Sequence, residues 1–174
     1  MNRNLHEHHA FKLINPEGVI MGKIMTTGTK KKKHFFTEGA ITPQQIADNI
    51  SKHSTKKNIG AHEIFLGQVR ADEINGKTVI AIEYSSYREM AESEMEKIRE
   101  SIIVKYQLTC AHVLHSIGIV KAGEISLFVF VSSQHRKEAM DACRELVELI
   151  KKEVPVFGKE IFEDESYQWK ENSI

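Results

Sequence analysis

The stretch that decides the fold is EISLFVFVSSQHRKEAMDACRELVELIKKEVPVFGKE, residues 124–160. Its first part has apolar side chains at both alternating sets of positions: Leu127, Val129 and Val131 on one face, Phe128 and Phe130 on the other. This pattern predicts a strand that is buried on both faces. Ser133 then predicts the N-cap of a long helix, and Pro155 predicts its end near residue 152.

The flanking sequence supplies more strands and helices. TPQQ at residues 42–45 has the order of a helix start with a threonine cap, and residues 87–106 have the spacing of a second helix. Asn75-Gly76 predicts a hairpin turn between strands at 59–70 and 78–84. Residues 110–120, 159–162 and 167–169 read as further strands. The order predicts an α+β fold with a largely antiparallel sheet and packed helices.

The bulk composition limits the classes of function. The chain has 174 residues, and its 24 basic and 24 acidic side chains cancel, so no general attraction to nucleic acid or membranes is expected. No apolar run approaches the length of a membrane span, which is about 20 residues. Two isolated cysteines form no disulfide framework. We therefore expect a cytoplasmic protein.

Residues 1–30 lack helical or strand periodicity and are predicted to be a poorly ordered extension, followed by one domain over residues 31–174. Four lysines at residues 30–33 precede Phe35 and Phe36. Such a run indicates either an anionic-ligand patch or an edge strand that its lysines protect, and the second is the commoner case.

Cationic residues sit at both ends of the long helix. His135 and Arg136 are placed in its first turn, where free backbone N–H groups already favour an anion. Lys151 is in the last turn and Lys159 follows Pro155, but a lysine near a helix C-terminus is also what the helix dipole favours. Arg70 ends a predicted strand, and an arginine in that position is typical either of a ligand-binding group or of a strand end that faces solvent.

Helix length separates these groups. His135 and Lys151 are sixteen positions apart, which is about 24 Å along a helix axis. One helix cannot bring both ends to one small ligand. Either the chain has two sites, or a second copy brings its His-Arg end to the first copy's lysine end, which predicts a pocket shared across a homodimer.

Metal and nucleotide motifs are missing from the sequence. It contains no HExxH, CxxC, P-loop or GxGxxG pattern. His112 and His115 are three apart on a predicted strand, so they face opposite sides and are poor candidates to ligate one metal.

An ordered set of segments carries a resemblance to a known family. The segments are GQVR at 67–70, EY at 83–84, YREMA at 87–91, HSIG at 115–118, SQHR at 133–136, residues 151–160 and Trp169. In this order and spacing, residues 33–170 resemble the large, catalytic subunit of molybdopterin synthase.

The resemblance implies an α/β hammerhead fold and a subunit that dimerises. It implies that a ubiquitin-like sulfur carrier, the small subunit, docks at each end to give a heterotetramer. The carrier's C-terminal Gly-Gly thiocarboxylate would donate sulfur to cyclic pyranopterin monophosphate and form the dithiolene of molybdopterin. No cofactor or metal is implied, because the sulfur arrives already activated.

The resemblance also implies the roles of particular residues. Lys151 and Lys159 would be catalytic, handling protons or stabilising charge during thioester formation and carrier release. The His-Arg pair would come from the neighbouring subunit. The substrate-binding set would be Gln68, Val69, Arg70, His135, Arg136, Lys151, Gly158, Lys159 and Glu160.

Two positions depart from the family pattern. Gly158 stands where the family usually has a lysine, with Lys159 one step later, and Ser116 stands where it usually has an arginine. Two alternatives therefore stay open: a catalytically impaired homologue that dimerises and binds the carrier without turnover, or an α+β module that binds a phosphorylated metabolite.

Overall fold

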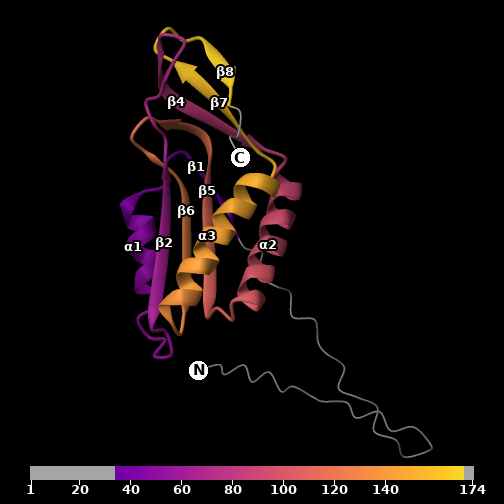
Figure 1. The fold of residues 1–174 in the computed structure, drawn as a ribbon. Helices are drawn as coiled ribbons and strands as arrows, with labels where there is room; N and C mark the ends of the chain where they lie inside the picture. The colour runs from indigo at the N-terminus through magenta and orange to yellow at the C-terminus, as the bar shows by residue number, and fades with distance from the viewer. Residues whose placement is uncertain (1–33, 171–174) are drawn as a thin grey trace, which may run out of the picture. The chain divides into compact units, whose positions relative to one another are not determined.

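The computed structural model describes residues 34–170 (Figure 1). The expected extension at residues 1–30 and the lysine run at 30–33 lie outside the described residues. The elements are β1 (Phe36–Glu38), α1 (Pro43–Ser51), β2 (Ala61–Gln68), β3 (Glu73–Ile74), β4 (Lys77–Ser86), α2 (Arg88–Lys105), β5 (Cys110–Lys121), β6 (Ile125–Ser133), α3 (Arg136–Glu153), β7 (Val156–Phe162) and β8 (Tyr167–Trp169). None of these helices is both long and apolar enough to span a membrane.

One sheet connects all the strands. Its order is β2-β6-β5-β4-β7-β8, with antiparallel neighbours throughout, while β1 pairs with the middle of β5 in parallel and β3 pairs with β4. This confirms the α+β fold with a largely antiparallel sheet. The turn predicted at Asn75-Gly76 is confirmed, and both of its residues have positive φ. The predicted pairing of the strands on either side was wrong: the turn joins β4 to the two-residue strand β3, and β2 pairs with β6 instead.

The long strand β5 belongs to two halves of the sheet. Its first residues pair with β6, and its last four residues, beginning at Gly118, pair with β4. Gly118 has a φ of 78°, and a Cβ there would lie 2.2 Å from a carboxylate oxygen of Glu38. The positive φ favours glycine where β5 passes from one half to the other, while the Glu38 side chain could move aside for a Cβ.

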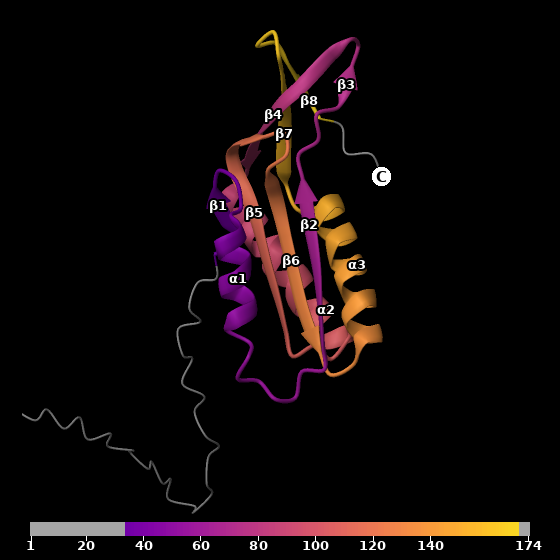
Figure 2. The same cartoon turned by 90° about the vertical axis from the view of Figure 1, so that its left-hand side faces the viewer.

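Helices cover both faces of β2, β6 and β5. Helices α2 and α3 pack on one face, and α1 lies on the other (Figures 1 and 2). The central strand β6 contributes to both layers, with Leu127, Val129 and Val131 in the core beneath α2 and α3, and Phe128 and Phe130 in the core beneath α1. The predicted burial of both faces is confirmed.

Two helix predictions are also confirmed. Helix α1 begins with a complete capping box, in which the Thr42 side chain accepts from Gln45 N and the Gln45 side chain accepts from Thr42 N. Helix α2 lies within the predicted range. Its buried apolar residues follow the expected spacing: Ala91, Met95, Ile98 and Ile102.

The predicted cap of α3 was wrong. Ser133 is the last residue of β6, because its backbone is committed to the sheet: it pairs with Ala61, and its carbonyl accepts from Gly60 N. The Ser133 hydroxyl donates to the carbonyl of His135 instead of capping the helix. His135 occupies the N-cap position without a side-chain cap bond, so Arg136 is the first helical residue.

Candidate functional site: two cationic ends of one helix

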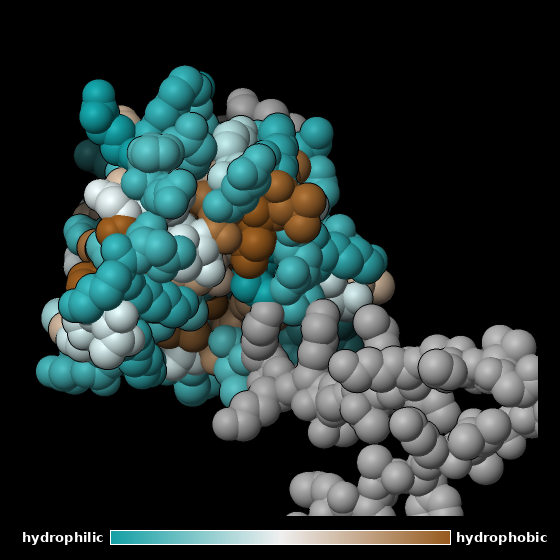
Figure 3. Space-filling view, turned by 90° about the horizontal axis from the view of Figure 1, so that it is seen from below, coloured by the Kyte–Doolittle hydropathy of each residue, from teal (hydrophilic) through white to brown (hydrophobic). Residues whose placement is uncertain are grey.

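A shallow depression lies at the N-terminal end of α3. It has a volume of about 400 Å³ and is lined by Gly60, Gln134, His135, Arg136, Lys137 and Glu138. Gly60 allows this arrangement, because a Cβ there would lie 2.2 Å from the carbonyl oxygen of Gln134. Figure 3 views the molecule from this end and shows mainly hydrophilic side chains with apolar areas between them. Backbone N–H groups and a polar surface suit an anion here.

Two cationic side chains at this depression are available to a ligand. His135 and Arg136 are exposed, and no hydrogen bond or ion pair joins either side chain to another residue within 34–170. Lys137 differs, since its Nζ lies 2.6 Å from Asp141 Oδ2. The guanidinium of Arg136 is therefore a free planar fork of the kind that binds phosphate or carboxylate in a bidentate way.

The C-terminal end of α3 has a different setting. Lys151 is exposed in the last turn of α3, and His115 is buried in the middle of β5. Burial lowers the pKa of His115, and the charge of Lys151 lowers it further. The His115 ring donates from Nδ1 to the carbonyl of Ser116 over 2.8 Å and lies edge-on to Tyr84, with ring centroids 5.1 Å apart. Nε2 of His115 therefore keeps its lone pair.

Tyr84 links this group to the end of β2. Its hydroxyl donates to Ser126 Oγ over 3.3 Å, and Ser126 Oγ donates to the carbonyl of Gly67 over 3.4 Å. Burial raises the pKa of Tyr84. The residue after Gly67 is Gln68, so the hydrogen bonds lead from the Lys151 end of α3 to the predicted substrate-binding segment.

The three residues of that segment have different surroundings. Gln68 ends β2 at an irregularity in its pairing with β6. Val69 is 2% exposed, and its backbone N–H and carbonyl are bonded to Glu124 and Gly123. Arg70 is exposed and its Nη2 lies 2.9 Å from Asp72 Oδ2. Arg70 is thus the charged group of the segment, and Val69 fixes the backbone from which it extends.

Strand β7 sends the other predicted residues to two faces. Gly158 lies opposite Tyr84, and a Cβ on it would be 3.6 Å from Tyr84 Cε1 and 3.6 Å from the Cβ of Lys170. Glu160 is on the same face, where its buried carboxylate accepts from Lys170 Nζ over 2.8 Å and from Gln168 Nε2 over 2.9 Å.

Lys159 points to the opposite face of β7. It forms an ion pair with Glu83, and its Nζ lies 4.9 Å from the ring centroid of Tyr167. Lys159 directly follows Gly158 on β7, and successive residues of a strand face opposite sides, so the two residues lie on different faces. The amine that shares a face with Gly158 is therefore Lys170, which the sequence interpretation missed. The pairing of β7 with the strand predicted at 167–169 was the available signal.

The structure thus brings together Tyr84, Gly158 and Glu160, with Lys151 in electrostatic reach of the neighbouring His115, and it does not bring the His-Arg pair to them. Helix α3 has 18 residues, which is about 27 Å of helix, and His135 and Lys151 lie at its opposite ends (Figure 1). Ser116, the second departure from the family pattern, is fully buried with an Oγ that has no hydrogen-bond partner among the described residues.

The fold and these groups define a class: an α+β protein with basic side chains at both ends of one long helix. Comparison with known proteins then gives the family. The family model described as MoaE protein matches residues 36–153, from the first residue of β1 to the last of α3. The match ends before Gly158, Lys159 and Glu160.

Curated relatives agree with this match. The molybdopterin synthase catalytic subunit of Pyrococcus abyssi is 39% identical over 86% of this chain and 93% of its own length. The subunit of the same name from Bos taurus is 33% identical over 87% of this chain and 78% of its own length.

Solved structures share the fold. Molybdopterin synthase from Staphylococcus aureus has a TM-score of 0.69 at 30% identity and covers 79% of this chain and 96% of its own. A complex of subunits 1 and 2 of molybdopterin-converting factor from Helicobacter pylori has a TM-score of 0.67 at 18% identity, over 78% of this chain and 88% of its own. The chain belongs to the MoaE protein family, and the resemblance in its sequence is confirmed.

Proposed function

We propose that this chain is the catalytic subunit of a molybdopterin synthase, a sulfurtransferase of molybdenum cofactor biosynthesis. The family match and the curated relatives over most of the chain support this activity. The reaction would pass sulfur from the thiocarboxylate of a small carrier subunit to cyclic pyranopterin monophosphate and form the dithiolene of molybdopterin. The Helicobacter pylori complex of two subunits supports a small-subunit partner.

The separation of cationic groups along α3 is the observation that carries the mechanism. The substrate has a phosphate and the sulfur donor is an anion, so one reaction centre needs several cations. Lys151 lies at one end of α3, His135 and Arg136 lie at the other end, and Arg70 follows the end of β2. The proposed centre is therefore composite: the His-Arg end of one protomer binds the substrate of its partner, beside the partner's Lys151.

Mixing of inactive variants tests the composite centre. One chain carries His135→Ala and Arg136→Ala, and the other carries Lys151→Ala; each is inactive alone with thiocarboxylated carrier and pterin precursor. If the centre is shared, random exchange of protomers restores one intact centre in half of the dimers, or about one quarter of the wild-type dithiolene formation. Two preparations of the same variant, mixed together, are the control. No recovery from exchanged dimers contradicts a shared centre.

The amine near Gly158 is assigned to Lys170 in this proposal. Lys170 shares a face with Gly158 and Tyr84, whereas Lys159 is engaged with Glu83 on the other face. Lys170→Met is expected to lower kcat by about 100-fold, typical of losing a charged group that stabilises a transition state. Lys159→Met is the matched control and should change kcat by less than threefold. The reverse order would assign the role to Lys159, as the sequence alone predicts.

The same assay decides between turnover and an impaired homologue. Gly158 in place of the family's lysine and Ser116 in place of its arginine are the features that favour impairment. Dithiolene formation with a competent carrier supports the proposed function. Carrier binding without product supports the impaired homologue, and no carrier binding supports a module for phosphorylated metabolites.

A further inference from the structure

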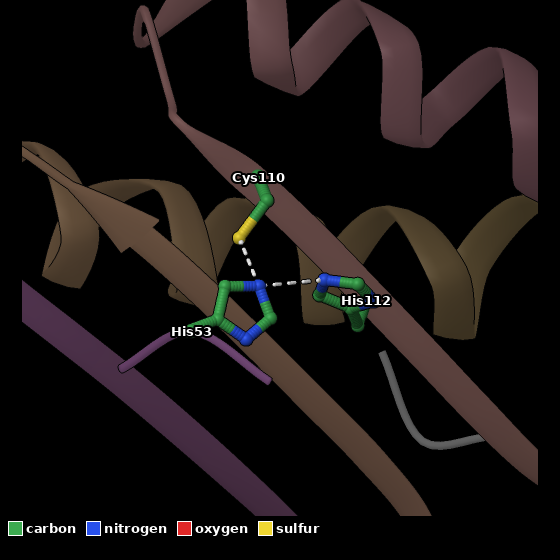
Figure 4. A group of neighbouring side chains, drawn as sticks. All are labelled: His53, Cys110 and His112. Atoms are coloured by element: carbon green, nitrogen blue, oxygen red, sulfur yellow. Dashed lines mark hydrogen bonds between the residues drawn. The ribbon is translucent and has the colours of Figure 1, made fainter. Parts of the chain in front are cut away.

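A cluster of two histidines and a cysteine lies on the α1 face of the sheet, apart from the groups described above. His53 Nε2 is 3.0 Å from Cys110 Sγ and 3.1 Å from His112 Nε2 (Figure 4). One ligand atom from each residue lies within 4.8 Å of the other two. His53 is buried, while Cys110 and His112 are half-buried.

Local structure explains why the three side chains meet. Cys110 and His112 are two apart on β5, so they project from the same face of the sheet. That face packs against α1. His53 lies in the turn that follows α1, and its backbone N–H donates to the carbonyl of Ile50. The sequence interpretation compared His112 with His115 and overlooked this partner, because His53 is far away along the chain.

The tautomer of His53 is set by its backbone partner. Its Nδ1 lies 2.7 Å from the carbonyl oxygen of Asn49, which can only accept, so Nδ1 carries the proton. Nε2 then offers its lone pair toward Cys110 and His112. Histidines that bind metals are commonly oriented in this way, through a hydrogen bond from the other ring nitrogen to a carbonyl.

Hydrogen bonds alone satisfy this cluster poorly. Without an ion, Cys110 and His112 would both donate to the one lone pair on His53 Nε2. A tetrahedral zinc ion, with bonds of about 2.0 Å to nitrogen and 2.3 Å to sulfur, holds its ligand atoms about 3.3–3.6 Å apart. The two pairs at 3.0 and 3.1 Å would separate by a few tenths of an ångström to admit it, and the third pair, Cys110 with His112, lies within 4.8 Å and would settle at the same spacing.

The surrounding charges set the conditions for binding. Arg99, Lys56 and Lys52 lie near enough to His112 for their positive charges to act on its ring. The same positive charges oppose a bound cation. A metal-bound cysteine is a thiolate, and its negative charge offsets part of that opposition.

We propose that His53, Cys110 and His112 bind one divalent transition metal ion of the zinc type, with water in the fourth position. One thiolate and two imidazoles form a ligand set that such an ion prefers to Mg²⁺ or Ca²⁺. Binding displaces the thiol proton of Cys110 and requires no redox change. The site is separate from sulfur transfer, and nothing in the proposed function depends on it.

The bound ion would fasten α1 to the sheet near the His-Arg loop. Cys110 pairs with Ser132 across β5 and β6, and Ser132 pairs with His62 on β2. Ser132 is three residues before His135, so the ion would hold the strand end from which the His-Arg loop begins. The expected role is therefore structural, in stabilising this end of the molecule.

Cobalt provides a specific probe of the site. Metal-free full-length chain is titrated with Co²⁺, and we expect one ion per chain with thiolate-to-cobalt charge-transfer absorption, which Zn²⁺ then abolishes. Cys110→Ser should remove the band, and His112→Asn should weaken binding by about 100-fold or more. Zn²⁺ should raise the Tm of the wild type and leave the Tm of both variants unchanged.

Two controls separate this site from other ligands in the chain. Cys143 is buried, and burial raises its pKa to about 11, so Cys143→Ser should leave the band intact. The sequence also has His6, His8 and His9, and the combined alanine variant at these positions should likewise keep the band. Absence of a thiolate band, its persistence in Cys110→Ser, or its loss from either control would overturn the proposal.

Discussion

At the N-terminal end of α3, Arg136 stands exposed, with no ion pair to another residue of the described part of the chain. At the C-terminal end, charged groups are engaged: Glu160 holds Lys170, and Lys159 holds Glu83. The first end is built like a site that receives a ligand, since its cations have no protein partner. The second is preorganised in part: protein groups fix the positions of Lys159 and Lys170, while Lys151 is exposed and forms no hydrogen bond or ion pair with another residue within 34–170.

Loss of the buried carboxylate at the second end should give the largest change in stability. Glu160 has a side chain 5% exposed, and it accepts from both Lys170 and Gln168. Glu160→Gln removes the charged partner of Lys170, which is itself 33% exposed, and we expect the free energy of unfolding to fall by about 1.5 kcal/mol. Urea titration measures it.

The matched control is Asp141→Asn, at the N-terminal half of α3. Asp141 pairs with Lys137 on the surface, where both side chains are about half exposed or more. An exposed pair of this kind contributes about 0.5 kcal/mol or less. If both substitutions lower the free energy of unfolding equally, the charged groups at the C-terminal end of α3 are no more firmly held than the exposed pair near its N-terminal end.

The sequence predicted the elements and missed how the two ends are arranged. The both-sided burial of β6, the capping box of α1 and the turn at Asn75-Gly76 are local patterns, so they could be read from neighbouring residues. The start of α3 was misplaced because Ser133 is a good cap by type, but tertiary pairing with β2 holds its backbone in the sheet.

In the candidate site, too, local features could be predicted from the sequence and contacts between distant segments could not. The helix-length argument separated His135 from Lys151 correctly, because rise per residue is fixed by the helix itself. Lys170 was missed because its closeness to Gly158 depends on the pairing of β7 with β8. The His53 cluster was missed for a similar reason, as it joins a turn to a strand 57 positions later.

The next prediction concerns the unpaired guanidinium of Arg136 at the N-terminal end of α3. Arg136→Ala should raise KM for the pterin substrate about 10- to 100-fold, since a charged hydrogen bond contributes about 1.5–3 kcal/mol. Arg136→Lys keeps the charge but loses the bidentate geometry, so its KM should lie between the values for the wild type and for Arg136→Ala. Steady-state kinetics with saturating carrier measures both.

Lys137→Ala is the control for that comparison, because Lys137 is adjacent in sequence but already paired with Asp141. Its KM should stay within about twofold of the wild type. If Lys137→Ala raises KM as much as Arg136→Ala does, the depression acts through general positive charge, and the free guanidinium has no special part.

The smallest expected effect concerns the electrostatic link between Lys151 and His115. The pKa of His115 lies below its ordinary value of 6.5, first because of burial and second because of Lys151. Lys151→Met removes the positive charge, so the pKa of His115 should rise, while burial still keeps it below 6.5. NMR titration of the ring protons measures the change, and Lys152→Met, at the next position along α3, should leave it unaltered.

The direction of the stability change follows from proton binding. Between the lowered pKa of folded His115 and 6.5, the unfolded chain binds more protons than the folded chain, so acid in that range destabilises the fold. Because Lys151→Met brings the two pKa values closer, the variant should lose less stability than the wild type as the pH falls below 6.5. If the pKa of His115 does not respond to Lys151→Met, Lys151 is not coupled to the buried His115 and its half-buried neighbour Tyr84. Lys151 would then be a surface lysine without a link to this group.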